Sequence, residues 1–440
     1  MGEWGMRLAA LLSLIVVASP MAQTSALTEQ ERALTTFIDA NNAQAIALLE
    51  KAVNINSGTM NFDGVRAVGA LFRAEFDALG FTTSWVDGTS VNRAGHLVAV
   101  HEPAGSRAPK ILLIGHLDTV FEPDSPFQKY TRVSDSAAKG PGITDMKGGN
   151  VIIVQALKAL KSAGLLSSMR ITVVMTGDEE SAGRPLESSR EALKNAAKGA
   201  DVAIGFEDGD GNPATAVIAR RGTSNWLLRV TGRPAHSSQI FNDENGYGAV
   251  FEAARILNSF RETLAGQPHL TFNPGVILGG TTVEFDTAQS RGTAFGKTNV
   301  IAEEVTVQGD VRALSPQQFA DAKAAMQKIV AQSLHRTSAT LEFDDGYPPL
   351  APKPGHEQLL EMYSQASVDV GAGKVIAVDP DKAGAADVSF VSDLVPMILD
   401  GVGLMGGGGH TVNETADMRT LPSQTKRVAV LLARLQRQSR

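Results

Sequence analysis

The stretch that most constrains this chain is residues 171–180, Ile-Thr-Val-Val-Met-Thr-Gly-Asp-Glu-Glu, in which a β-branched apolar run ends in three acids. Its length and composition are typical of a strand buried on both faces of a parallel sheet, and Gly177 lets the backbone turn as it leaves. Open α/β sheets bind ligands at the carboxyl ends of such strands. Side chains alternate along extended backbone, so Glu179 and Glu180 can do different jobs: one binds a metal while the other faces a metal-bound water. Taken alone, three acids are more often a solvated turn.

Two further apolar runs end in polar side chains in the same way. Residues 111–114 lead into Gly-His116-Leu-Asp118, and residues 201–206 lead to Glu207. Residues two apart in extended chain share a face, so Asp118 can accept the other ring N–H of His116 and fix its tautomer for metal binding. We therefore expect these ends to meet the acids of residues 178–180 at one edge of a sheet.

The segment 140–149, Gly-Pro-Gly-Ile-Thr-Asp-Met-Lys-Gly-Gly, opens an amphipathic helix that ends near Gly164. Asp145 in this segment is either a site residue or simply the N-cap of the helix, and in isolation the N-cap is favoured. Near the other end of the chain, the glycine run 406–409 is followed by His410.

Composition narrows the chemistry. With 440 residues, 43% of them hydrophobic, the chain is long enough for two or three domains. The net charge of −7 and the lack of a basic stripe argue against a nucleic-acid or anionic-membrane surface. The chain has no cysteine, which excludes thiolate zinc sites and a cysteine nucleophile, so His, Asp and Glu must hold any metal.

Residues 1–26 are interpreted as a signal peptide, because Arg7 precedes a short apolar run, residues 8–18, and a small-residue cleavage site follows at residues 24–26. A cut after Ala22 is an alternative. We expect a periplasmic or secreted protein without stable membrane association after cleavage. An uncleaved anchor is disfavoured because the run is too short to span a bilayer.

The rest of the chain is predicted to be an α/β catalytic domain with a mostly parallel sheet, interrupted by an insertion. The first part of this domain covers residues 27–220 and the second part residues 347–440. Between them, residues 221–346 have the element order βαββαβ, which is that of a ferredoxin-like α+β domain.

Five segments together resemble one family of di-zinc hydrolases, that of glutamate carboxypeptidase, peptidase T and succinyl-diaminopimelate desuccinylase. They are Gly-His116-Leu-Asp118, the segment 140–149, Asp-Glu179-Glu180, Phe-Glu207 and Gly-Gly-His410-Thr-Val-Asn-Glu. The resemblance covers nearly the whole mature chain, with the segments in the family's order and with an inserted lid in the expected place.

The resemblance implies two Zn²⁺ per chain, with Co²⁺ or Mn²⁺ as substitutes. It implies that His116 and Glu207 hold one ion, that Glu180 and His410 hold the other, and that Asp145 bridges them. Three carboxylates against two Zn²⁺ leave a net charge of about +1, so the site stays electrophilic.

The catalytic roles follow from the same resemblance. Glu179 becomes the general base for a zinc-activated water, and Asp118 orients His116.

In the lid, the resemblance implies that His236 supplies an oxyanion donor, usually to the active site of the partner subunit in a homodimer. Asn299 and Arg312 match positions that hold the terminal carboxylate of the substrate. The simpler alternatives are a loop histidine for His236 and a strand-edge charge for Arg312.

Two segments depart from the family pattern. A glycine-rich loop of the family appears here as Gly384-Ala385-Ala386-Asp387, and the family's Arg-Gly-Arg-Pro at the lid exit appears as Asp345-Gly346-Tyr347-Pro348. The cation expected to grip an acidic substrate side chain is therefore missing from this position.

These features predict an exported, zinc-dependent, carboxypeptidase-like metallopeptidase that hydrolyses the amide bond before a C-terminal amino acid, in a small peptide or an N-acyl amino acid. Within the family, the alternative is a dipeptidase or an N-acyl-amino-acid deacylase. The alternative from another class is a non-catalytic periplasmic binding protein that keeps the zinc, although zinc binding alone does not need Glu179.

Overall fold

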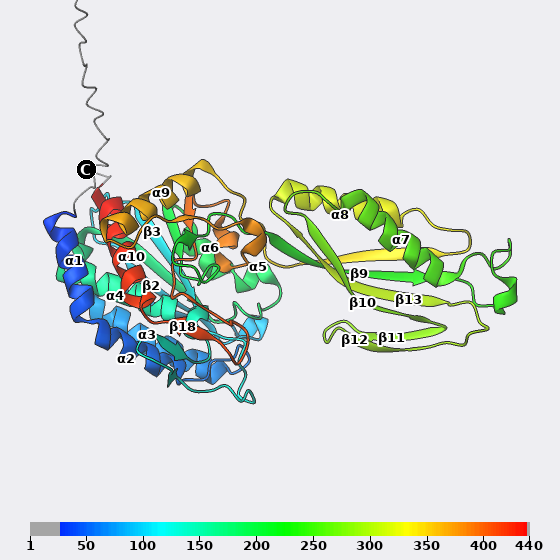
Figure 1. Cartoon of the computed structure of the whole chain (residues 1–440), viewed down its shortest axis with the longest axis horizontal. Helices are drawn as coiled ribbons and strands as arrows, with labels where there is room; N and C mark the ends of the chain where they lie inside the picture. The colour runs from blue at the N-terminus through cyan, green and yellow to red at the C-terminus, as the bar shows by residue number, and fades with distance from the viewer. Residues whose placement is uncertain (1–26, 438–440) are drawn as a thin grey trace, which may run out of the picture.

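The computed structural model describes residues 27–437, which form two lobes side by side along the long axis of the molecule (Figure 1). One lobe contains both ends of the described chain, and the other is a single insertion, the lid. The predicted signal peptide lies outside the described residues. Between residues 27 and 437, no helix is long and apolar enough to cross a membrane.

The catalytic lobe is built on a six-stranded sheet of order β1-β2-β6-β3-β7-β16. Strands β6, β3, β7 and β16 are parallel, whereas β2 runs antiparallel to both β1 and β6. This confirms the predicted α/β class with a mostly parallel sheet. The strands are β1 (Thr82–Asp87), β2 (Gly95–His101), β3 (Lys110–His116), β6 (Arg170–Thr176), β7 (Val202–Gly205) and β16 (Met397–Leu399).

Both faces of this sheet are buried, which explains the unbroken apolar runs in the sequence. Along β3, Ile111 and Leu113 join the core on one face, and Leu112 and Ile114 join the core on the other. The surrounding helices are α1 (Glu29–Ala40), α2 (Asn42–Val53), α3 (Phe62–Leu79), α4 (Gly148–Ser162), α5 (Leu186–Ser189), α6 (Glu191–Ala197), α9 (Pro354–Asp369) and α10 (Thr420–Arg437).

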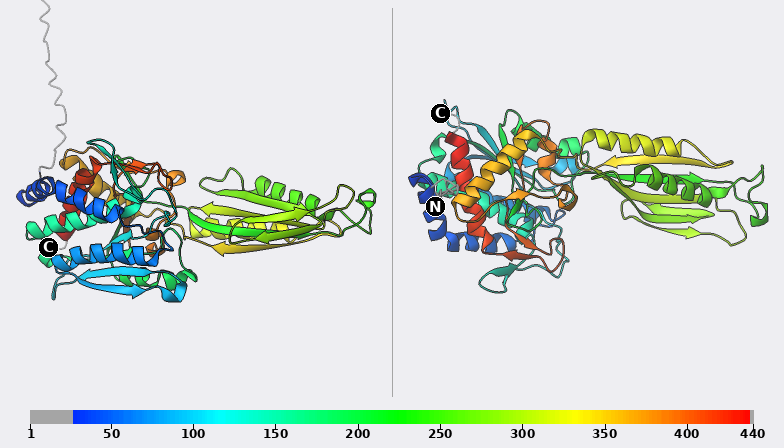
Figure 2. Two further views of the ribbon diagram at one scale, coloured as in Figure 1. Left: turned by 90° about the horizontal axis from the view of Figure 1, so that it is seen from below. Right: turned by 45° about the horizontal axis from the view of Figure 1, so that its top comes forward.

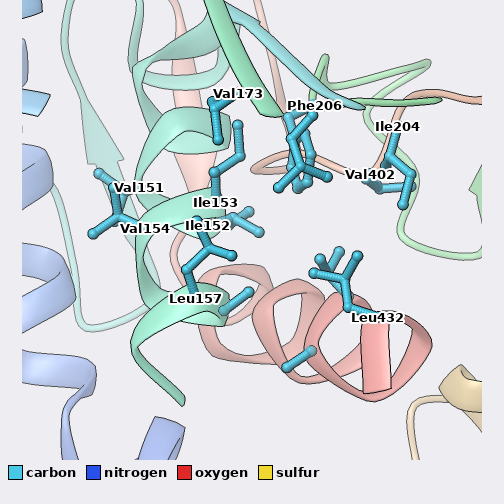
Figure 3. Packing of buried hydrophobic residues seen from close by; sticks show 14 of the residues in the cluster. Val151, Ile152, Ile153, Val154, Leu157, Val173, Ile204, Phe206, Val402 and Leu432 are labelled. Atoms are coloured by element: carbon cyan, nitrogen blue, oxygen red, sulfur yellow. The ribbon is translucent and has the colours of Figure 1, made fainter. Parts of the chain in front are cut away.

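Helix α4 differs from its prediction as an amphipathic helix. Every residue from Gly148 to Leu157 is buried, because the sheet covers one side of α4 while α1, α2, α3 and α10 cover the other. Figure 3 shows its side chains between those of the sheet and Leu432 of α10. A helix that is apolar all round is a core element, and α4 therefore fixes the segment that precedes it, which contains Asp145.

The lid contains a four-stranded antiparallel sheet of order β10-β13-β9-β14, with two helices on one face (Figure 2). Its elements follow the order βαββαβ, with one addition: a hairpin of β11 and β12 lies between β10 and β13, and the sequence analysis did not predict it. The elements are β9 (Gly222–Thr231), α7 (Gly248–Leu264), β10 (Thr271–Gly280), β11 (Thr282–Asp286), β12 (Arg291–Phe295), β13 (Glu304–Ala313), α8 (Pro316–Val330) and β14 (Ser338–Asp345).

A small antiparallel sheet in the catalytic lobe fixes the base of the glycine-rich loop. Its order is β17-β18-β5-β4, and the loop between β17 and β18 carries His410. The strands are β4 (Thr131–Arg132), β5 (Ala137–Lys139), β17 (Gly406–Gly407) and β18 (Thr415–Asp417), and a separate parallel pair consists of β8 (Thr215–Ala216) and β15 (Ile376–Ala377).

Candidate active site

The segment after β6, residues 177–180, is held by hydrogen bonds to its backbone. The amide of Gly177 donates to Nδ1 of His96 at 3.2 Å. A Cβ on Gly177 would lie 2.2 Å from the carbonyl oxygen of Gly95, so this position needs glycine for close approach to β2. The backbone that leads into Asp178, Glu179 and Glu180 is therefore fixed at Gly177.

Asp118 positions both glutamates. One carboxylate oxygen accepts the amide of Glu179 at 3.0 Å, and the other accepts the amide of Glu180 at 3.1 Å and the hydroxyl of Thr59 at 2.7 Å. Nδ1 of His116 lies 3.1 Å from the main-chain oxygen of Asp118 and 3.4 Å from its carboxylate. Asp118 therefore faces His116 as expected. The acceptor nearest to Nδ1 of His116 is, however, the main-chain oxygen of Asp118, while the carboxylate of Asp118 accepts the two amides.

One group of candidate metal ligands consists of His116, Asp145 and Glu207. Nε2 of His116 is 2.9 Å from Oδ1 of Asp145 and 3.5 Å from Oε1 of Glu207. The ligand atoms of these residues lie within 4.8 Å of one another. They come from the ends of β3 and β7 and from the segment before α4, so the carboxyl ends of neighbouring parallel strands meet there, as the sequence predicts.

The second group shares Asp145. Nε2 of His410 is 2.9 Å from Oδ2 of Asp145 and 3.3 Å from Oε2 of Glu180. Asp145 thus presents one oxygen to each group. It is not the N-cap of α4, which starts at Gly148 after Lys147, so the N-cap interpretation is wrong.

The donor set fits two divalent cations. Oε1 of Glu180 is buried and has no hydrogen-bond partner, which is costly unless a cation or proton compensates it. Imidazole and carboxylate ligands without thiolate suit zinc and its borderline neighbours. With one carboxylate shared between two groups of three candidate ligands, each of two ions would have its own set of ligands.

The surroundings of the candidate ligands shift their pKa values strongly. Burial raises the pKa of Glu180 and of Glu207 to about 7. Hydrogen bonds to Asp145 and Glu180 raise the pKa of His410 to about 11. Burial lowers the pKa of His116, but the charge of Glu207 and bonds to Asp118 and Asp145 outweigh it, so the net shift is well upward. Metal binding replaces such protons, so it should be accompanied by proton release.

Glu179 does not belong to either group. Burial raises the pKa of its carboxyl well above the usual range, and the charges of Glu207, Asp387 and Glu180 add to the shift, against the opposing effect of His116. A carboxylate held beside a cation site without being one of its ligands is suited to accept a proton from water.

A further layer of side chains holds the ligands. Glu414 accepts the amides of Gly142, Thr144 and Asp145 at 2.9, 2.8 and 3.3 Å, which fixes the segment that carries Asp145. The carboxylate of Asp400 accepts the amide of Glu207 at 3.4 Å and is paired with Arg220 at 2.8 Å. Such outer contacts commonly orient ligands, and no motif in the sequence pointed to Asp400 or Arg220.

The lid residues predicted to bind substrate are not close to one another. Arg312 pairs with Thr223 near the catalytic lobe, whereas Glu304, on the same strand β13, pairs with Thr231 at the far end. The eight residue steps from one pair to the other span about 26 Å. His236 and Asn299 both lie at the far end, where the amide of Ser237 donates to the main-chain oxygen of Asn299 at 2.9 Å. One chain therefore cannot place all three on one substrate.

Tyr347 occupies the position where the resemblance leads to an arginine. Its hydroxyl donates to the main-chain oxygen of Glu179 at 2.7 Å and accepts from Nη2 of Arg190 at 2.9 Å. Arg190 itself is buried and paired with Asp178 at 2.6 Å and Asp387 at 2.8 Å. The charge of Arg190 is thus neutralised by two carboxylates of the protein. Arg190 therefore does not replace the missing arginine in binding an acidic side chain of the substrate. Nothing in the sequence pattern linked Arg190 to Tyr347.

A third group of potential ligands, His269, Asp379 and Asp381, lies between the lobes. Asp381 is already paired with Arg221 at 3.5 Å. The negative charge of Asp381 is therefore compensated by Arg221, without a metal ion.

Comparison with known proteins identifies the family. The model of peptidase family M20/M25/M40 matches residues 112–434. The chain belongs to this family. Carboxypeptidase G2 of a Pseudomonas species is 27% identical over 95% of each chain, and an acetylornithine deacetylase of Yersinia pseudotuberculosis is 25% identical over 70% of this chain and 74% of its own. The protein is therefore a hydrolase of the metallopeptidase and amidohydrolase type.

The fold of this M20 protein is also found among solved structures. Aminopeptidase PepT of Bacillus cereus superposes with a TM-score of 0.71, covering 90% of this chain and 99% of its own at 18% identity. At that identity, the likeness concerns the fold alone. The family and fold expected from the five sequence segments are thus confirmed.

Proposed function

We propose that the protein is an exported di-zinc amide hydrolase that releases the C-terminal amino acid from a small peptide or an N-acyl amino acid. The observation that carries the proposal is the pair of ligand groups joined by Asp145, with Glu179 beside them and outside both. The carboxypeptidase and deacetylase relatives support amide hydrolysis and leave the acyl group open.

Five residues would hold the two ions, His116 and Glu207 one of them, Glu180 and His410 the other, with Asp145 between. Bound zinc would polarise the amide carbonyl and lower the pKa of a water to roughly 7. Glu179 would accept a proton from that water and pass it to the leaving nitrogen. Asp118 fixes the amides of both glutamates and thereby the direction of the Glu179 carboxylate.

We propose that the active site is completed by a second copy of the chain. Strand β9 starts at the junction of the lobes and runs away for about 26 Å between Thr223 and Thr231, and the segment with His236 follows at the far end (Figure 1). His236 and Asn299 are thus too distant to serve the site of their own chain, whereas Arg312 is on the near side. In a homodimer, His236 and Asn299 of one chain would join Arg312 of the other around one substrate.

The surface of the lid supports this assembly. Phe241 packs edge-on against Tyr247 and Phe251, with ring centroids 5.4 and 5.3 Å apart, yet Phe241 and Phe251 are 56% and 50% exposed. An exposed aromatic cluster is characteristic of an interface. Its first member, Phe241, follows His236 by five residues, so a second copy that covers the cluster would also lie close to His236.

Export is proposed from the sequence of residues 1–26, and a chain without cysteine is suited to an oxidising compartment. Sequencing the amino terminus of protein from the periplasmic fraction tests this. A mature terminus near Leu27 or Gln23 supports it, and an intact Met1 in the cytoplasmic fraction contradicts it.

The decisive experiment on function is a substrate panel. Zinc-loaded protein, residues 27–440, is incubated with dipeptides and N-acetyl and N-succinyl amino acids whose C-terminal residues are acidic, apolar or basic, and released amino acid is measured. Glu179→Gln serves as the matched control for contaminating hydrolases.

Each result has a distinct meaning. Release of the C-terminal residue from N-acyl amino acids and peptides supports the carboxypeptidase-like proposal. Release only from free dipeptides identifies a dipeptidase, and release only from one N-acyl class identifies a deacylase. No release from any substrate, with two zinc ions bound, supports a binding protein and contradicts the proposal.

A further inference from the structure

Two chain segments cross between the lobes and are bonded to each other. Arg220 and Leu350 exchange backbone hydrogen bonds of 3.0 and 2.9 Å. Closer to the lid, the amide of Thr223 donates to the oxygen of Tyr347 at 2.9 Å, and the amide of Gly346 donates to the oxygen of Thr223 at 3.0 Å. These residues form a two-stranded connection between the lobes, here called the hinge, and Tyr347 is part of it.

The side chain of Tyr347 leaves this hinge and reaches the segment with the two glutamates. Its hydroxyl has one proton and donates it to the main-chain oxygen of Glu179 at 2.7 Å, because its other neighbour, Arg190, can only donate. The ring packs on Phe390, with centroids 4.9 Å apart. The direction of the hydroxyl is therefore fixed from both sides.

Arg190 acts as the rigid anchor of this contact. Its side chain is fully buried between the carboxylates of Asp178 and Asp387, and it also donates to the main-chain oxygen of Asp178 at 3.1 Å. Its guanidinium carbon lies 5.7 and 5.3 Å from the ring centroids of Tyr347 and Phe390. A cation held by two buried carboxylates cannot shift to follow a displaced tyrosine without a large cost.

The peptide group between Glu179 and Glu180 is consequently held at both ends. Tyr347 binds its carbonyl oxygen at 2.7 Å, and Asp118 binds its N–H at 3.1 Å. Rotation of this one peptide plane would redirect the carboxylates of both glutamates. Asp118 belongs to the catalytic lobe, whereas Tyr347 belongs to the hinge.

We propose that Tyr347 is a positioning residue that links the lid hinge to Glu179, so that the orientation of the general base depends on the hinge. The inference rests on the proposed function, in which Glu179 is the base. It assigns the tyrosine found at the family's arginine position to positioning, and not to gripping a substrate side chain.

The first test is Tyr347→Phe, which removes the hydroxyl and keeps the ring on Phe390. We expect kcat to fall about 10- to 100-fold while KM stays within about twofold and two zinc ions remain bound. Tyr363→Phe is the matched control, because Tyr363 is a buried tyrosine away from the site, whose hydroxyl donates to Gln424 at 2.8 Å. If both variants lose similar thermal stability and neither loses kcat, Tyr347 is merely structural and the proposal is wrong.

The second test separates the hinge from local packing. Thr223→Val removes the hydroxyl that accepts the amide of Tyr347 at 3.2 Å. We expect it to lower kcat about two- to fivefold in the wild-type background and to have no further effect when combined with Tyr347→Phe. An equal loss in both backgrounds, or no loss in either, would mean that the hinge does not act through Tyr347.

The Glu179→Gln variant separates a failure of the proposed function from a failure of the positioning role of Tyr347. If Glu179→Gln turns over like wild type, the proposed function itself is wrong. If Glu179→Gln is inactive while Tyr347→Phe matches the Tyr363→Phe control, only this inference is overturned.

Discussion

The two lobes use their strands differently. Strands β3 and β6 of the catalytic lobe are buried along almost their entire length, whereas β9 of the lid alternates between buried and accessible residues. A sheet covered on both faces fixes its strand ends, and the candidate ligands lie at those ends. A sheet covered on one face leaves its other side accessible, and the candidate lid residues lie there or in loops.

The same contrast appears around individual side chains. Asp118 holds the amides of Glu179 and Glu180, whereas the side chain of His236 is exposed and bonded only to Ser238, at 2.8 Å. Side chains of a functional site must be held in one orientation by surrounding contacts. An exposed histidine lacks such contacts unless a second surface covers it. The catalytic lobe therefore contains all the candidate metal ligands, whereas His236 of the lid fits the proposed role in an interface with a second chain.

Metal removal should produce the largest difference between the lobes. Exhaustive chelation is expected to abolish turnover and lower the unfolding temperature of the catalytic lobe, because bound metal stabilises only the state that holds it. The lid transition should not move. Calorimetry with and without chelator measures both, and two equivalents of zinc should restore activity. A lid transition that shifts equally, or full recovery with one equivalent, would contradict this division.

Glu179→Gln sharpens the comparison within the catalytic lobe. The variant keeps the shape of the side chain and all five candidate ligands, so both metals should stay bound. Turnover is expected to fall roughly 10²- to 10⁴-fold, the usual contribution of a positioned base. Metal analysis and steady-state kinetics on the same sample provide the measurement. Loss of a metal would make Glu179 a ligand instead.

His236→Ala tests whether the lid completes a partner's site. The loss of one oxyanion donor is expected to lower kcat about 10²- to 10³-fold. Mixing His236→Ala chains with Glu179→Gln chains should restore part of the activity, because a mixed dimer contains one intact site.

Two controls accompany the mixing experiment. Subunit exchange is verified with differently tagged chains, and each variant is also mixed with itself. No recovery after verified exchange would show that His236 acts in its own chain or not at all.

The smallest expected effect concerns stability far from the site. Burial raises the pKa of Glu31, but bonds from Arg434, Thr28 and Arg437 outweigh it and lower the pKa to about 2. A lowered folded pKa stabilises the fold above the unfolded value near 4.5, and this stability is lost as the pH falls towards 2. Glu31→Gln should thus lower the free energy of unfolding by about 1–2 kcal/mol at pH 7.

Denaturant unfolding of wild type and Glu31→Gln at several pH values measures this effect. The gap between the two proteins should narrow as the pH falls below about 4.5. An equal gap at pH 7 and pH 3 would assign the loss to packing and not to charge.

The sequence alone indicated the residue types of the candidate site and the strand ends that carry several of them. His116, Glu180 and Glu207 each follow a buried strand, which is a local pattern, and parallel strands bring such ends together. Asp145 and His410 joined the predicted ligands only through the resemblance to a family. The absence of cysteine restricted the ligands further. The order βαββαβ of the lid was visible for the same reason, since each element has its own periodicity.

Only the tertiary structure decided the relations between distant residues. That α4 is buried all round depends on four other helices. That Asp145 is shared by the two candidate ligand groups, and is not an N-cap, depends on two histidines 29 and 265 positions away. The contact of Tyr347 with Glu179 spans 168 positions, and the separation of Arg312 from Asn299 follows from strand register. Such relations have no local signature, because they arise from how the chain packs and not from what any short stretch prefers.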